Sequence, residues 1–380
     1  MKVYNSSLDI IDASYTSPYE EMQFIIHTLY DIKINANVCI VHNTVDIGGF
    51  AEKDNIVDLT DEAADKINEA NIDLVILLVV EASTPLSDIS LSAIRRYEQI
   101  KKNKVIITPE YNNYLPVKLK QIEYAGMFTF ICRALTFNNH PYPIDNIPYK
   151  KKYLFSSLMG VIRANRISNF IEFKKSNYFN KSLITLNAIK LYPGTTFNET
   201  VNWIHQELYN IDPTYIELFN KDIIPALPIK ICQNESDILL IDPNNSLPAK
   251  DLLDPRNSAY LDSYINVAVE TRHHYPLFTD KVIKSFLAEQ FFVMIGGKNL
   301  VATMKRAGID VYDDIIDHAV YDQDDDGTRI QSVHKLLNDI QYYDWEEIYR
   351  DTRERRKYNR HLMENQVLER KFKQQIIECL

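Results

Sequence analysis

Short apolar segments alternate with amphipathic segments along most of this chain, and the alternation limits the folds open to it. Apolar runs bounded by turns are typical of buried strands, and apolar residues three or four positions apart are typical of helices. A parallel sheet with helices on both faces has this order, so we expect an α/β fold. In the first part of the chain, strands are expected at 38–42, 56–59, 74–80, 105–108 and 128–132, and helices at 19–30, 61–70, 89–101 and 114–124.

A second alternating pattern follows a segment with three prolines between residues 140 and 148. Proline continues neither a helix nor a central strand, so this segment is expected to link two domains. Beyond it, strands are expected at 153–156, 182–186, 264–270 and 291–295, and helices at 161–174, 198–208, 280–288, 299–307 and 326–339. Residues 233–262 are polar and rich in proline and asparagine, and the charged tail from Trp345 is expected to form one long helix.

The predicted architecture is two Rossmann-like domains that face a central cleft, followed by a long C-terminal helix. The expected boundaries are residues 1–139 for the first domain, 140–152 for the linker, 153–343 for the second domain and 344–380 for the helix.

Composition excludes several classes of protein. The chain has only 9 glycines in 380 residues, and neither G-x-G-x-x-G nor G-x-x-x-x-G-K-[ST] occurs, so those two phosphate-binding loops are excluded. The 4 cysteines lie far apart, which favours free thiols in a reducing compartment. No apolar signal segment follows Met1, and the longest apolar run, 74–80, is too short to span a membrane. A net charge of −10 argues against tight non-specific binding to nucleic acid.

The segment 264–287 carries the most informative chemistry. An apolar strand ends in Glu270, and a loop leads to Thr279, Asp280 and Lys281 at the start of a helix. Thr279 suits the N-cap and Asp280 suits the helix dipole. Lys281 does not, because a cation at a helix N-terminus is unfavourable unless an anion such as phosphate binds there. An ordinary capped helix with a solvated Lys281 explains the same residues equally well.

Two further pieces could meet a ligand. Gly296 and Gly297 follow an apolar strand, where glycine allows positive φ and close approach of the backbone to a ligand, although a tight strand–helix turn needs them too. Arg163 and Arg166 follow the first strand of the second domain, and arginine binds phosphate in a bidentate way. Without context, two surface arginines are the more common explanation.

The acidic stretch 322–326 has some of the spacing of a calcium-binding EF-hand loop. Its twelfth position is Val333 instead of glutamate, so the calcium interpretation fails. We expect these acids to cap the helix that begins near Gly327, with an Asp-x-Asp metal site for a diphosphate as the alternative. His273-His274 lacks the spacing of a zinc site, and the basic residues of the tail are typical of a solvated helix face.

Together these pieces resemble a known family. Glu270, Thr279-Asp280-Lys281, 291–296, 300–308 and Tyr321-Asp322…Arg329 occur in this order in glycosyltransferases. Residues 150–340 resemble the donor domain of fucosyltransferase-like enzymes and related phage and bacterial transferases, which have the GT-B architecture. Two residues depart from the family pattern, because Asp280 replaces the usual glutamate and Phe291 stands where proline is common. The first domain resembles no family that we recognise.

The resemblance implies roles for particular residues. Lys281 would bind the diphosphate of the donor, and Asp280 the ribose hydroxyls. Arg166, helped by Arg163, would also contact the diphosphate, and Glu270 would border the donor sugar. Gly296 and Gly297 would bring the backbone close to the ligand. The implied function is the transfer of a sugar from a nucleotide-diphosphate sugar to a hydroxyl, an EC 2.4 activity, with cations and helix N-termini in place of a metal ion.

The first domain would then bind the acceptor and supply a base. The candidates at its sheet ends are Glu81, which ranks first because it follows the strongest apolar run, and His42, Asp46 and Glu110. The acceptor could be a glycan, a small molecule or a modified base of phage DNA. A nucleotide-binding module without activity is the alternative function, since fold alone does not fix function. We expect a cytoplasmic location, in the host if the chain is viral.

Overall fold

The computed structural model forms two compact units, of which unit 1 comprises residues 1–130 and 366–380 and unit 2 residues 131–365. The expected domain boundaries remain a prediction, because most of the expected linker lies outside the described residues. The structure describes residues 2–4, 10–11, 26, 29–30, 36–44, 61–80, 97–108, 120–123, 147, 149–188, 196–227, 229–231, 258–270, 280–364 and 367–378.

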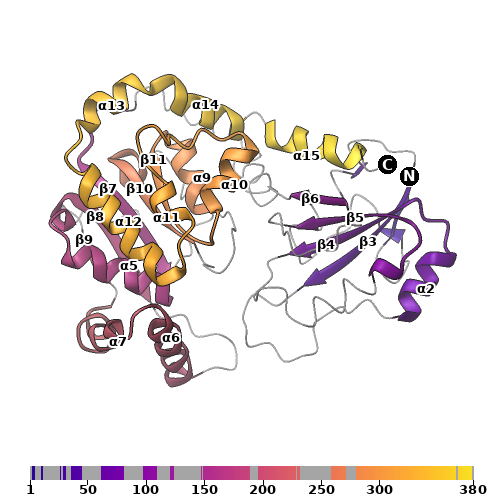
Figure 1. Ribbon diagram of the computed structural model, residues 1–380, viewed down its shortest axis with the longest axis horizontal. Helices are drawn as coiled ribbons and strands as arrows, with labels where there is room; N and C mark the ends of the chain where they lie inside the picture. The colour runs from indigo at the N-terminus through magenta and orange to yellow at the C-terminus, as the bar shows by residue number, and fades with distance from the viewer. Residues whose placement is uncertain are drawn as a thin grey trace. The chain divides into compact units, whose positions relative to one another are not determined.

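Unit 1 is built on a six-stranded sheet (Figure 1). The strands are β1 (Lys2–Tyr4), β2 (Ile10–Ile11), β3 (Asn37–Thr44), β4 (Leu74–Val80), β5 (Asn103–Thr108) and β6 (Lys120–Glu123). Their order is β2-β1-β3-β4-β5-β6, and all neighbours pair in parallel except β1 and β2. The strands predicted at 38–42, 74–80 and 105–108 are confirmed, and those predicted at 56–59 and 128–132 lie outside the described residues.

The prediction of a helix over residues 114–124 is wrong where the structure describes this segment. Residues 120–123 form β6, which pairs in parallel with β5 so that Ile122 lies opposite Ile107. Ile122 is buried and its neighbours are polar, which suits a short edge strand. The pairing with β5 decides the conformation, and a window of local sequence does not contain that information.

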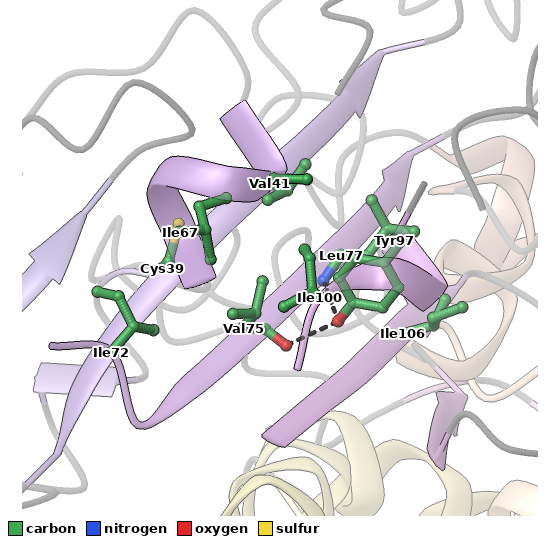
Figure 2. Packing of buried hydrophobic residues seen from close by; sticks show 10 residues of the cluster. Cys39, Val41, Ile67, Ile72, Val75, Leu77, Tyr97, Ile100 and Ile106 are labelled. Carbon is green, nitrogen blue, oxygen red and sulfur yellow. Dashed lines mark hydrogen bonds between the residues drawn. The ribbon is translucent and has the colours of Figure 1, made fainter. Parts of the chain in front are cut away.

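The core of unit 1 lies between the sheet and α2 (Asp61–Glu69), as Figure 2 shows. Cys39 is a buried free thiol, as its apolar surroundings predict, and burial raises its pKa to about 12. The Tyr97 hydroxyl lies 2.7 Å from the carbonyl oxygen of Val75 and 2.6 Å from that of Val105, and accepts the Leu77 N–H at 3.2 Å. The alternate side chains of the strands are buried as well, so both faces of the sheet are covered.

Unit 2 is built on a five-stranded sheet in the order β11-β10-β7-β8-β9. Its strands are β7 (Tyr153–Val161), β8 (Ser182–Ala188), β9 (Ile229–Ile231), β10 (Ser263–Val269) and β11 (Phe291–Ile295). All neighbours pair in parallel except β8 and β9. Every residue of β10 and β11 is buried, which explains why both strands read as nearly continuous apolar runs.

Helices cover both faces of this sheet (Figure 1). The α-helices of unit 2 before the tail are α5 (Ala164–Lys175), α6 (Phe197–Ile211), α7 (Thr214–Leu218), α8 (Ser258–Leu261), α9 (Asp280–Leu287), α10 (Leu300–Ala307), α11 (Ala319–Asp322) and α12 (Asp326–Ile340). Helix α5 packs against α6 and α12. Right-handed crossovers place α5 and α9 on opposite faces, because the chain moves from β7 to β8 in one direction and from β10 to β11 in the other.

The strand order therefore reverses between β7 and β10. The chain runs outward from β7 to β8, then returns to the other side of β7 for β10 and β11. In open α/β sheets, ligands bind outside the carboxyl ends of the strands at such a switch point. The described strands of unit 1 show no such reversal, because β3, β4, β5 and β6 follow one another in sequence order.

In the described residues of the C-terminal tail there are three helices, with a turn at Thr352 where a single helix was expected. They are α13 (Trp345–Asp351), α14 (Arg353–Glu364) and α15 (Val367–Ile377), and α15 packs against β6 in unit 1. The chain turns at Thr352, whose hydroxyl donates to the Ile348 carbonyl at 2.7 Å. Beyond this turn Arg356 is buried, with its guanidinium 3.3 Å from the centre of the Tyr349 ring. The charge pattern of the sequence alone does not reveal this interruption.

Candidate functional site

Glu270 lies at the carboxyl end of β10, beside the switch point. Its side chain is fully buried, and its backbone N–H donates to the Ile295 carbonyl at 2.8 Å, so the chain is fixed to the end of β11. A buried carboxylate requires a compensating partner. Lys281 supplies one, because its Nζ lies 3.4 Å from Glu270 Oε2.

Lys281 is the second residue of α9 and keeps part of its side chain in solvent. Its exposed fraction is 20%, against 0% for Glu270. The long ion pair and this partial exposure leave room for the ammonium to contact a second anion. Helix α9 begins at Asp280, as the sequence predicts, which places Lys281 in the first turn.

The first turn of α5 brings two arginines and an asparagine to the end of β7, next to β10. Arg163 is the N-cap residue, and its side chain makes no capping hydrogen bond. Arg166 is buried in the same turn and is 4% exposed. Between them, Asn165 Nδ2 donates to the Glu270 carbonyl at 2.8 Å. This hydrogen bond joins the two arginines to the strand that carries Glu270.

Gly296 lies against the Glu270 side chain. A Cβ at this position would clash with Leu300 Cδ2 and would lie 3.4 Å from Glu270 Cγ. Among the described glycines, positive φ is found at Gly308 and not at Gly296, so space and not backbone conformation requires glycine here. The Gly296 carbonyl accepts a hydrogen bond from Arg329 NH1 at 2.5 Å, and Gly297 is buried beside it.

The carboxylate of Asp322 already occupies the N-terminus of α10, which follows Gly296 and Gly297. Asp322 accepts the Val301 N–H at 2.9 Å and the Ala302 N–H at 3.0 Å. Burial raises the pKa of Asp322, and the two N–H groups oppose that rise. These first N–H groups of α10 are therefore already hydrogen-bonded to Asp322 and are not available to bind a phosphate.

Other helix N-termini of unit 2 are capped in the same manner. Thr196 and Glu199 form a capping box on α6, and Asp325 accepts the Thr328 N–H at 2.9 Å on α12. The Asp325 contact confirms that an acid of this stretch caps the helix near Gly327. Helix α5 differs, because its first turn holds no acidic residue and two arginines. Cations at a helix N-terminus oppose the helix dipole, and a bound anion removes that conflict.

Several predicted site residues lie outside the described residues. Thr279, Glu81, Asp46 and Glu110 fall there, and the side chains of Asp280 and His42 are not described. The structure therefore brings together Glu270, Lys281 and Gly296 directly, and links them to the turn that holds Arg163 and Arg166. Gly297 lies next to Gly296. The choice of Glu81 as the base remains a prediction.

Sequence reasoning missed Asn165 and gave Arg329 no role. Asn165 stands between the two arginines, and its position in a first turn after a parallel strand is the signal that could have identified it. The role of Arg329 depends on contacts with Gly296, 33 residues away, and with the Asp324 carbonyl. Local sequence does not predict such contacts.

In the described part of the chain, no three His, Cys, Asp or Glu side chains gather in a way that could hold a metal ion. No helix among the described residues has the length and apolar character that crossing a membrane requires.

No protein-family model matches this chain, and no curated protein matches it. Among solved structures, it is similar to the UDP-forming α,α-trehalose-phosphate synthase of Burkholderia xenovorans, with 9% identity and a TM-score of 0.41 over 92% of this chain and 76% of the other. It is also similar to the α,α-trehalose 6-phosphate synthase of Burkholderia multivorans, with 10% identity and a TM-score of 0.41 over 97% of this chain and 77% of the other.

Proposed function

We propose that this chain is a glycosyltransferase that moves a sugar from a nucleotide-diphosphate sugar to a hydroxyl acceptor. One observation carries the proposal. At the switch point of the unit 2 sheet, the first turn of α5 with Arg163 and Arg166 is hydrogen-bonded through Asn165 to Glu270, which is paired with Lys281 on α9. Cations from two helix N-termini thus belong to one hydrogen-bonded group at the place where α/β sheets bind ligands.

The cations would act on the leaving group. As the bond between the anomeric carbon and the diphosphate breaks, its electron pair moves to the diphosphate oxygen, and the acceptor oxygen bonds to the anomeric carbon. Arg166 and Lys281, with Arg163, would stabilise the growing negative charge, as a metal ion does in other enzymes. The acceptor proton would pass to a base, for which Glu81 remains the first candidate and His42, Asp46 and Glu110 are the alternatives.

The remaining contacts follow from the resemblance. Asp280 would bind the ribose hydroxyls, and Glu270 would border the donor sugar. Gly296 and Gly297 would keep the backbone close to the ligand. The diphosphate is proposed to use α5 and α9 and not α10, because Asp322 occupies the N-terminus of α10.

The acceptor is proposed to be a glycan or small molecule in preference to DNA. The basic tail and the linker lysines give DNA weak support, the net charge of −10 weighs against it, and three of the arginines of the tail are engaged within unit 2. Arg355 pairs with Asp310 and Asp314, and Arg356 and Arg360 pair with Glu289. Arginines held in ion pairs contribute little to an electrostatic contact with phosphates.

Titration calorimetry tests the proposed anion site. Titration of UDP, GDP, ADP, CDP and dTDP should reveal at least one nucleotide that binds. Arg166→Ala should lower the affinity for that nucleotide by about 10- to 100-fold, which is the effect of one or two charge-assisted hydrogen bonds. Lys174→Ala, at the other end of α5, is the matched control and should leave the affinity unchanged. Equal affinities of the Arg166→Ala variant and the wild type would remove Arg166 from the site.

The alternative is a nucleotide-binding module without activity. Such a module would bind the same nucleoside diphosphates with the same dependence on Arg166. It would not release a nucleoside diphosphate from any sugar nucleotide, with or without an acceptor. Product release therefore separates the two functions where affinity does not.

A further inference from the structure

Asn165 carries a buried hydrogen-bond acceptor that the described residues leave unused. The residue is 1% exposed, and its Nδ2 donates to the Glu270 carbonyl at 2.8 Å. Its Oδ1 has no hydrogen-bond partner among the described residues. The orientation of the amide is fixed, because the Glu270 carbonyl can only accept a hydrogen bond and therefore faces the NH₂ group.

An orphan acceptor at this place indicates the chemistry of the ligand. Buried polar atoms in native proteins nearly always have partners, and each exception requires an explanation such as an absent ligand or water. Asn165 lies in a turn rich in positive charge, between Arg163 and Arg166. Ionised phosphate oxygens only accept hydrogen bonds, so a phosphate can satisfy the arginines but not Asn165 Oδ1. A ligand that satisfies Asn165 Oδ1 brings an O–H or N–H donor next to its anionic group.

We propose that Asn165 is a ligand-binding residue whose Oδ1 accepts a hydrogen bond from a sugar hydroxyl next to the diphosphate. This inference rests on the proposed function and extends it, because it makes the site selective for a sugar-bearing diphosphate over a bare one. The hydroxyl belongs either to the ribose or to the transferred sugar. Both sources offer the same donor, and the experiment below distinguishes them.

A second amide in α5 provides a matched control. Asn169 lies one helical turn after Asn165 and is fully buried. Its Nδ2 donates to Ser157 Oγ at 3.1 Å, and its Oδ1 lies 2.9 Å from His334 Nε2. Both ends of this amide are used inside the protein, so its removal should affect folding and not ligand selectivity.

The test is a cycle between protein and ligand variants. Calorimetry would compare wild type, Asn165→Ala and Asn169→Ala. For each protein it would measure the affinity for inorganic pyrophosphate and for the nucleoside diphosphate that binds. It would also measure the affinity for the 2′-deoxy and 3′-deoxy forms of that nucleotide and for the corresponding sugar nucleotide. Asn165→Ala should lower the affinity for the hydroxyl-bearing ligand about 10-fold more than the affinity for pyrophosphate, which is the effect of one hydrogen bond. Removal of the recognised hydroxyl should weaken binding to wild type about 10-fold and leave binding to Asn165→Ala unchanged.

The outcomes of this test distinguish the two possible sources of the hydroxyl, and they distinguish failure of this inference from failure of the proposed function. A loss of affinity with a deoxyribose form that is present in wild type and absent in Asn165→Ala assigns the hydroxyl to the ribose, because a contact with Asp280 would give the same loss in both proteins. If Asn165→Ala weakens binding of the sugar nucleotide alone, the hydroxyl belongs to the transferred sugar. Equal loss for every ligand, or the same loss in Asn169→Ala, would overturn the inference and leave Asn165 a structural residue or one that holds a water. Wild type alone still tests the inference if Asn165→Ala does not fold, because equal affinities for pyrophosphate, the nucleoside diphosphate, its deoxy forms and the sugar nucleotide would overturn it. No binding of any nucleoside diphosphate to wild type would overturn the proposed function itself.

Discussion

Lys281 Nζ lies 3.4 Å from Glu270 Oε2, and this ion pair joins the first turn of α9 to the carboxyl end of β10. The two partners differ in exposure, because Glu270 is fully buried and Lys281 is 20% exposed. The carboxylate therefore depends on the lysine, while the lysine can still reach a ligand. This asymmetry suits a cation that neutralises a buried acid and a bound diphosphate together.

Substitution of Lys281 should affect both stability and binding. Lys281→Met removes a charged partner of a buried carboxylate, so we expect the free energy of unfolding to fall. The fall should stay below the roughly 3–5 kcal/mol of a fully buried pair because Lys281 is partly exposed. We expect the affinity for the nucleoside diphosphate to fall by about 10-fold or more. Urea denaturation and calorimetry measure the two effects.

The control is Lys305→Met, which removes an exposed lysine of α10 that pairs with Asp313. Lys305→Met should change neither the stability nor the affinity for the nucleoside diphosphate appreciably, because exposed ion pairs contribute little to stability. The double variant Lys281→Met/Glu270→Gln should regain stability but not affinity, since it removes the buried negative charge without restoring the cation. Recovery of affinity in the double variant would contradict the role given to Lys281.

Gly296→Ala tests whether the space beside Glu270 is needed. The added Cβ would clash with the buried Leu300 side chain and press on Glu270, so we expect a loss of about 1–3 kcal/mol in the free energy of unfolding. Leu300→Val added to Gly296→Ala should relieve the clash and return part of the stability. If affinity for the nucleoside diphosphate recovers with it, the backbone at Gly296 does not contact the ligand.

Asp322 should stabilise α10 through its cap. Asp322→Ala frees the Val301 and Ala302 N–H groups, and we expect a loss of about 1–2 kcal/mol in stability by thermal or urea unfolding. Asp322→Asn keeps one acceptor oxygen and should lose less. An Asp322→Ala variant as stable as wild type would show that the cap contributes nothing.

Lys151 should make stability rise with pH above neutrality. Burial, with the nearby charge of Arg356, lowers the Lys151 pKa to about 7, whereas an unfolded chain keeps the ordinary value of 10.5. Between these values the unfolded state binds more protons, so stability increases with pH through this window. From pH 7 to 8.5 the gain attributable to Lys151 should be about 1.5 kcal/mol.

Lys151→Met isolates this effect. The Lys151 ammonium donates to the Leu261 carbonyl at 2.6 Å and lies 4.5 Å from the centre of the Tyr349 ring, where methionine fits without a charge. The slope of stability against pH, measured by urea denaturation, should be flatter in the variant between pH 7 and 8.5. Lys150→Met, at the exposed neighbour, should keep the wild-type slope. Identical slopes in Lys151→Met and wild type would show that Lys151 stays charged when buried.

The sequence predicts those elements whose conformation depends on their own residues. The apolar runs of β4, β10 and β11 identify buried parallel strands, and Asp280 correctly marks the start of α9. The prediction fails where distant contacts decide. Residues 120–123 form a strand because β5 pairs with them, and the tail turns at Thr352.

In the candidate site too, the sequence predicts local features and misses those that depend on distant contacts. Glu270 and Lys281 were identifiable because a strand end and a helix start are local features, and the structure brings them within 3.4 Å. The cap of α10 was not, because Asp322 acts from 21 residues beyond Val301. Asn165 was missed for a related reason, since its importance depends on the Glu270 carbonyl 105 residues away.

Release of nucleoside diphosphate from a panel of sugar nucleotides tests the central claim most directly. Wild type and Lys281→Met would be incubated side by side with UDP-, GDP-, ADP-, CDP- and dTDP-sugars, and the free nucleoside diphosphate measured by chromatography. We predict release from at least one member by wild type, at a rate about 10-fold or more above that of Lys281→Met. Equal rates in the two proteins, or no release by a wild type that binds the same nucleoside diphosphate, would contradict sugar transfer at this site.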